Sequence, residues 1–248
     1  MQHLYRDDSY AERCDATVVR AGPEGIRLDR TVFYPAGGGQ PGDTGRLTLA
    51  GGTLAGGRTI AIVDTVKDPT DGGVLHVPAD GSELPPEGAV VSAELDWDRR
   101  YRLMQMHTCL HLLCAIVPGG VTGGSIGDGK GRLDFDLGDQ PLDKEAIAAQ
   151  LNALVEADHL VRIGSISDEE LAANPEIVRT MSVKPPTGSG RVRIVEIGPA
   201  DSPVDRQPCG GTHVRRTGEV GRVLVAKIEN KGRRNRRINI AFPDRGQP

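Results

Sequence analysis

The distribution of apolar positions divides the chain into two stretches of different character. From about residue 12 to residue 95, short apolar runs alternate with clusters of glycine, proline and aspartate, and no helical period is sustained. The apolar runs are Ala16–Val19, Gly25–Leu28, Thr59–Val63 and Ala89–Leu95. This pattern is typical of short antiparallel strands, and we predict a small β-barrel domain over residues 1–92.

Helical periodicity begins after this stretch. Asp96 or Asp98 can cap a helix over about residues 99–117, which ends at Pro118-Gly119-Gly120. A glycine-rich loop is predicted over residues 119–131, and a strand follows it over residues 132–136.

The rest of the chain mixes helices and strands without a regular βαβ alternation. Helices are predicted at residues 143–157 and directly after Ser167, and strands at 191–197, 220–228 and 237–242. The predicted class is therefore α+β, with the barrel followed by a two-layer α/β domain over residues 93–248.

Two short segments, far apart in the sequence, offer ligands for a transition metal. His107-Thr108-Cys109-Leu110-His111 lies in the first predicted helix, where positions i and i+4 share a face. Cys209-Gly210-Gly211-Thr212-His213 follows a proline in a glycine turn, where the backbone can crowd closely. Three imidazoles and one thiolate suit Zn²⁺. The predicted metal ligands are His107, His111, Cys209 and His213.

Several residues near the first segment are open to a simpler interpretation. Cys114 shares the helical face of His107 and His111, so it can replace Cys209 as a ligand or simply fill the core. Met104 and Met106 are expected to pack in the core. Residues 124–131 resemble a phosphate-binding loop, but Gly131 stands where Ser or Thr is needed and a strand follows, so nucleotide hydrolysis is not expected.

The charge of the chain is unevenly distributed. The net charge is −4, but the stretch from Arg206 to Pro248 holds 11 Lys+Arg against 3 Asp+Glu, which gives +8 and leaves −12 elsewhere. This cationic end favours contact with phosphates, although a solvated surface is the alternative. Aromatic residues make up only 3% of the chain, which argues against a base-stacking platform. The strongest cluster is Lys231, Arg233, Arg234, Arg236 and Arg237.

The sequence contains no sign of secretion or membrane insertion. The first residues lack an apolar run with a basic lead, and no stretch reaches the roughly 18 apolar residues that span a bilayer. Four cysteines with ligand-like spacing indicate reduced thiols. We expect a cytoplasmic protein with no membrane partner and no obligate protein partner.

These segments resemble the paired signatures of the editing domain of alanyl-tRNA synthetase and of the freestanding alanyl-tRNA editing proteins, the AlaX group. The stretch from Asp29 to Gly45, with Gly37-Gly38-Gly39-Gln40, is similar to the N-terminal block of that family. Leu133-Asp134-Phe135-Asp136 and Arg236-Arg237-Ile238 fit as well. The length resembles the freestanding form, and the glycine block resembles its medium-length class. Cys109 departs from the small residue, such as Ala, expected there.

The resemblance implies a deacylase that removes Ser, and in some members Gly, wrongly attached to tRNA(Ala). It implies a catalytic Zn²⁺ site at His107, His111, Cys209 and His213. Thr31 matches the threonine that reads the serine hydroxyl in this family. Substrate contacts are expected at Gly38, Gly39 and Gln40, and tRNA contacts at Lys231, Arg233, Arg234, Arg236 and Arg237.

The mechanism and two other functions stay open at this point. Catalytic zinc normally keeps one position open, whereas four protein ligands describe a closed site. The ion can become five-coordinate, one ligand can be loose, or the metal can only orient the substrate, which is the option we favour. The alternative functions are a zinc-stabilised RNA-binding protein without hydrolase activity and a zinc hydrolase of another ester.

Overall fold

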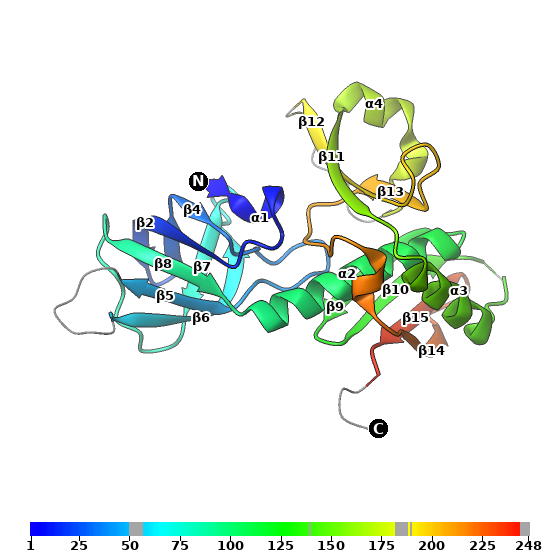
Figure 1. Ribbon diagram of the computed structural model, residues 1–248, viewed down its shortest axis with the longest axis horizontal. Helices are drawn as coiled ribbons and strands as arrows, with labels where there is room; N and C mark the ends of the chain where they lie inside the picture. Colours follow the sequence, from blue (N-terminus) through cyan, green and yellow to red (C-terminus); the bar gives the residue numbers. More distant parts are fainter. Residues whose placement is uncertain (50–56, 139, 182–187, 189, 244–248) are drawn as a thin grey trace. The chain divides into compact units, whose positions relative to one another are not determined.

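The computed structural model describes residues 1–49, 57–138, 140–181, 188 and 190–243. The chain divides into two compact units, Met1–Tyr101 and Arg102–Pro248 (Figure 1). The predicted boundary between residues 92 and 93 falls inside strand β8 (Val90–Leu95), which pairs with two other strands of the first unit. Along the chain, the boundary between the units falls within helix α2 (Trp97–Ile116).

The first unit is a closed six-stranded barrel with the strand order β2-β3-β7-β6-β5-β8. Burial alternates along its strands, as in β6, where Ile60 and Ile62 are buried and Thr59 and Ala61 are exposed. Apolar side chains on the inward positions therefore fill the barrel. Its remaining strands are β2 (Arg13–Gly22), β3 (Gly25–Leu28), β5 (Gly45–Leu49), β6 (Thr59–Lys67) and β7 (Val74–Pro78).

The N-terminus lies against the barrel. Strand β1 (Gln2–His3) pairs in parallel with β4 (Arg30–Thr31), and the short helix α1 (Leu4–Asp7) follows. Strands β5 and β7 were not predicted from the sequence. The barrel itself was predicted, and the structure confirms it.

A four-stranded antiparallel sheet forms the base of the second unit, in the order β14-β15-β10-β9. The predicted glycine-rich loop over 119–131 is wrong, because those residues form the hairpin of β9 and β10. Glycine serves close packing there: a Cβ at Gly124 would lie 2.8 Å from Leu133 Cδ2. The strands are β9 (Gly120–Gly127), β10 (Lys130–Asp136), β14 (Leu224–Asn230) and β15 (Asn235–Ala241).

Two helices pack on this sheet. Met106 of α2 lies against Gly131 of β10, where a Cβ would come within 2.8 Å of the Met106 sulfur. Helix α3 (Lys144–Glu156) begins at its cap Asp143, whose carboxylate accepts from Glu145 N and Ala146 N. The amide of Asn152 on α3 bonds the carbonyl of Val223, just before β14. The predicted helix over residues 143–157 is therefore confirmed.

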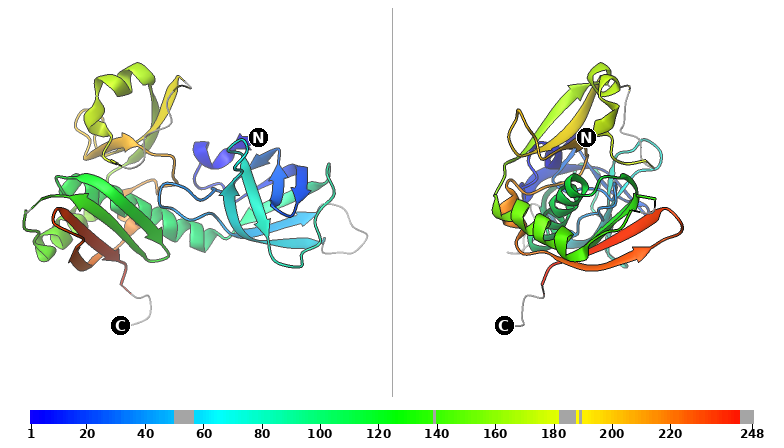
Figure 2. Two further views of the ribbon diagram at one scale, coloured as in Figure 1. Left: turned by 180° about the vertical axis from the view of Figure 1, so that it is seen from behind. Right: turned by 90° about the vertical axis from the view of Figure 1, so that its right-hand side faces the viewer.

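A smaller three-stranded sheet completes the second unit (Figure 2). Strands β11 (Val161–Ser167), β12 (Arg191–Ile197) and β13 (Asp205–Pro208) form it, and helix α4 (Asp168–Ala173) packs on one face. Single turns at Pro175–Ile177 and Thr217–Val220 connect the elements. The predicted α+β class is confirmed. Among the described residues, no helix is long and apolar enough to cross a bilayer.

Candidate metal centre

Three histidines and one cysteine converge inside the second unit. His107 and His111 lie one turn apart on α2, with ring centroids 5.3 Å apart. Cys209 and His213 come from the loop after β13. The candidate ligand atoms of all four residues lie within 4.8 Å of one another. The structure thus brings together the four residues that the sequence singled out.

The spacing of these donors fits a tetrahedral ion. The Cys209 sulfur lies 3.5 Å from His107 Nε2 and 3.6 Å from His213 Nε2. Usual Zn–S and Zn–N bond lengths at a tetrahedral angle require an S···N separation of about 3.6 Å. The three histidines are also nearly inaccessible to solvent. The donor set and its geometry therefore suit Zn²⁺.

Hydrogen bonds hold the two halves of the centre together. Thr108, one residue after His107, accepts a bond from Val214 N, one residue after His213 (3.2 Å). Arg193 on β12 donates from Nη1 to the carbonyl of Cys209 (2.5 Å), and Cys209 N donates back to the carbonyl of Arg193 (3.3 Å). Hydrogen bonds thus link the helix, the ligand loop and the small sheet around the four candidate ligands.

Asp205 and Gln207 reach the centre from β13, and sequence reasoning missed both. His111 Nδ1 donates to Asp205 Oδ2 over 2.7 Å, and both residues are buried. Gln207 Nε2 donates to both oxygens of Asp205, at 3.0 and 2.9 Å. The signal was the alternation of Asp205, Gln207 and Cys209, because side chains two apart on a strand share a face.

The charges in the centre favour a metal-binding protonation state at Cys209. Burial raises the pKa of Cys209, but the neighbouring His107 and His213 outweigh it and hold that pKa well below its usual value. Burial and the nearby His107 lower the pKa of His213 to about 3. Burial also lowers the pKa of His111, yet the bonds to Asp205 and Cys209 prevail and raise it to about 10. A thiolate is the form in which Cys209 ligates a metal.

The two cysteines of α2 do not belong to the candidate ligand group. Cys109 and Cys114 are buried, and burial raises the pKa of each thiol to about 12. The group of candidate ligands found among the described residues contains Cys209 and neither of these two. They behave as small core residues.

Comparison with known proteins gives a consistent result. Residues 192–239 match the family described as the threonyl and alanyl tRNA synthetase second additional domain. The chain is 33% identical to the alanyl-tRNA editing protein AlaX-M of Methanosarcina mazei, over 97% of this chain and 96% of that protein. It is also 33% identical to AlaX-M of Saccharolobus solfataricus, over 96% and 97%.

The chain belongs to the AlaX-M family of alanyl-tRNA editing proteins. It is also 35% identical to the alanine–tRNA ligase of Pyrobaculum neutrophilum, over 92% of this chain but only 25% of that ligase. The likeness to the synthetase therefore concerns one part of a much longer protein.

Thr31 lies in the barrel unit and is fully buried. His76 Nδ1 donates to the carbonyl of Ile26 (2.9 Å), so its Nε2 accepts from the Thr31 hydroxyl (2.8 Å). The same hydroxyl accepts from Phe33 N (3.0 Å). Thr31 thus has a structural task in the barrel, whatever its part in recognition.

The predicted substrate contacts at Gly38, Gly39 and Gln40 form a tight turn in the same unit. Gly37 and Gln40 exchange two backbone hydrogen bonds of 3.0 Å, and Gly38 and Gly39 have φ values of +58° and +83°. Two successive positive φ values define a turn that favours glycine at both positions. Gln40, the last residue of the turn, is buried, whereas a Cβ on Gly38 would meet open space.

The basic cluster lies at the turn between β14 and β15, and acidic groups offset much of it. Arg237 pairs with Asp134 through two bonds of 2.7 and 2.9 Å, which raises its pKa, and Arg234 pairs with Asp136 at 3.0 Å. Arg236 bends back over carbonyls of its own turn. Lys231 and Arg233 are exposed at the tip. The sequence therefore overstated the charge available to a ligand.

Proposed function

We propose that this protein hydrolyses the ester of serine wrongly attached to tRNA(Ala), with Gly-tRNA(Ala) as the second substrate to examine. The observation that carries the proposal is the convergence of His107, His111, Cys209 and His213 on a volume fit for one ion. Membership of the AlaX-M family, whose named members are alanyl-tRNA editing proteins, supports the same assignment.

The chemistry explains why such an activity is needed. A pocket built for alanine cannot exclude the smaller glycine by size, and it discriminates by only about a hundredfold against a side chain that merely adds a hydroxyl. A second site that hydrogen-bonds the hydroxyl leaves its polar groups unpaired when alanine binds. Such a site discriminates by about 10⁴-fold or more.

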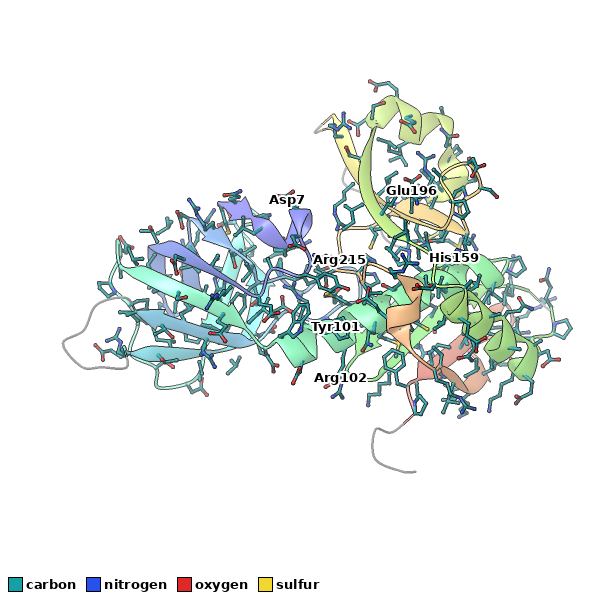
Figure 3. All side chains as sticks on the ribbon, viewed as in Figure 1. Asp7, Tyr101, Arg102, His159, Glu196 and Arg215 are labelled. Carbon is teal, nitrogen blue, oxygen red and sulfur yellow. The ribbon has the colours of Figure 1, made fainter. Side chains whose placement is uncertain are left out.

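In this proposal the four converging residues hold Zn²⁺. When bound, that ion supplies a Lewis acid that binds and polarises an ester. The chain itself supplies a buried ligand set, in which His111 donates to Asp205 and Arg193 donates to the carbonyl of Cys209. His159, labelled in Figure 3, lies in the same unit, but its hydrogen bonds with Thr217 are made by its backbone. Its N–H donates to the Thr217 hydroxyl, and its carbonyl accepts from Thr217 N. We assign it no catalytic part.

We further propose that the tip of the β14–β15 turn contacts tRNA phosphates. Lys231 and Arg233 support this because both are exposed there, Lys231 with Glu229 at 3.7 Å, whereas Arg237 is only partly exposed and is held by Asp134. A variant with both changed to alanine should bind every tRNA more weakly. The plot of log K against log salt should become less steep, its negative slope shrinking in magnitude by about 2. A loss confined to one tRNA would argue against simple phosphate contact.

Thr31 remains our candidate for reading the serine hydroxyl, a role that rests on the family resemblance. The test compares Thr31→Val with wild type on Ser-tRNA(Ala) and Gly-tRNA(Ala). A role in recognition predicts a selective loss on the serine substrate, because glycine offers no hydroxyl. An unchanged ratio of the two rates removes Thr31 from recognition.

The decisive experiment measures release of labelled amino acid from Ser-, Gly- and Ala-tRNA(Ala), with and without a chelator. We expect release of serine that disappears on chelation and returns with Zn²⁺, and little release of alanine. Binding without release would favour a metal-stabilised RNA-binding protein. Release from other small esters but not from tRNA would favour a different zinc hydrolase.

A further inference from the structure

The small sheet β11–β12–β13 has two faces with different tasks. One face carries Val192, Ile194 and Glu196; its apolar side chains pack against α4, and Glu196 pairs with Arg206 (Figure 3). The pairing of Val195 with Gln207 and of Ile197 with Asp205 puts these residues on the opposite face. From that face Asp205 reaches His111.

The Asp205 carboxylate accepts hydrogen bonds from two side chains. One oxygen accepts from His111 Nδ1, and Gln207 Nε2 donates to both oxygens. The carboxylate is 3% exposed, so its contacts come from protein. Because the proton of His111 is on Nδ1, Nε2 is the nitrogen that can bind a metal together with the other three candidate ligands. A carboxylate that orients a histidine in this way also makes the imidazole a more basic metal ligand.

His213 provides an internal contrast. Its Nε2 also faces the Cys209 sulfur, but its Nδ1 is buried and has no hydrogen-bond partner within the described part of the chain. The two imidazoles therefore belong to one centre but differ in their support. Only one of them is tied to a carboxylate, and that carboxylate is itself fixed by Gln207.

We propose that Asp205, held by Gln207, is a positioning residue that orients His111 and sets the metal affinity of the centre. The proposal rests on metal binding by these four residues but not on the identity of the substrate. A residue that merely stabilised the fold would leave metal affinity unchanged. The effect of an outer carboxylate of this kind on affinity is about 10- to 100-fold.

The test measures Zn²⁺ affinity by competition with a chromophoric chelator, together with the absorption of the Co²⁺-loaded protein. Asp205→Ala should bind Zn²⁺ about 10- to 100-fold more weakly. Asp205→Asn should lose less, because its amide oxygen still accepts from His111. The Co²⁺ absorption should change in Asp205→Ala, since the geometry of one ligand is released.

Asp134→Asn is the matched control. Asp134 is also a largely buried, paired carboxylate of the second unit, but it bonds Arg237 and Arg132. This variant should keep the wild-type affinity even if it lowers the melting temperature. Wild-type affinity in Asp205→Ala, with only a lower melting temperature, would overturn the positioning role. Absence of metal binding by the wild type would instead overturn the metal site itself.

Discussion

Both units bury histidine, and the two environments differ in one decisive respect. In the barrel, His76 has both ring nitrogens satisfied by protein: Nδ1 by the carbonyl of Ile26 and Nε2 by the hydroxyl of Thr31. In the second unit, His107 and His213 turn Nε2 towards the same sulfur. There, four candidate ligand atoms crowd into one volume, within 4.8 Å of one another, instead of pairing one to one. A buried imidazole is thus structural when protein completes it and a ligand when other ligands face it.

The sharpest test of this comparison replaces the thiolate. Cys209→Ala should weaken Zn²⁺ binding by more than about 100-fold, because removal of a ligand exceeds the usual effect of an outer residue. Competition with a chromophoric chelator measures it. Cys109→Ala is the matched control on α2, and it should keep the affinity since Cys109 is a buried core residue outside the candidate ligand group. Equal losses in both variants would show that the thiol ligand was assigned wrongly.

The second test concerns pH and the barrel. Burial lowers the pKa of His76 to about 4, against 6.5 for an ordinary histidine, so the folded barrel favours the neutral ring. This stability is fully present above pH 6.5 and is lost as the pH falls towards 4. Between pH 7 and pH 5 the loss should be about 2 kcal/mol.

Trp97 offers a probe for that loss. It is the only tryptophan of the chain and packs against the barrel core, so its fluorescence reports unfolding of the first unit. Urea titrations at pH 7 and pH 5 measure the change. His76→Gln removes the titrating group and should lose much less over the same interval. An equal pH dependence in the variant would assign the effect to other groups.

The sequence singled out the residues of the candidate ligand group because the two motifs are local. His107 and His111 share a helical face whatever surrounds them, and Cys209 and His213 share one short loop. The barrel was predictable from its alternating runs. What the sequence did not show was long-range: the partner of Thr31 lies on β7, and the carboxylate for His111 lies on β13. The hairpin of β9 and β10 was missed because glycine usually signals a loop, whereas here it permits close packing.

The third test separates the two parts that Thr31 can play. Thr31→Val keeps the shape but leaves His76 Nε2 without a donor, which should destabilise the barrel by about 1–3 kcal/mol. Thr31→Ser keeps the hydroxyl and should stay close to wild type. Urea unfolding followed by Trp97 fluorescence measures both. Identical stabilities of the Val and Ser variants would mean that the hydroxyl does not complete His76.

The smallest effects are expected at the basic turn, where the same principle of satisfied and unsatisfied groups applies to charge. Arg237 is engaged by Asp134, so Arg237→Ala should lower the melting temperature and leave that carboxylate without its principal partner. Arg233 is exposed at the tip, so Arg233→Ala should leave the melting temperature unchanged and weaken tRNA binding slightly. Thermal unfolding and a salt series of tRNA binding distinguish the two. If Arg237→Ala instead weakened binding without affecting unfolding, its pairing with Asp134 would yield to phosphate, and the basic cluster would act as one surface.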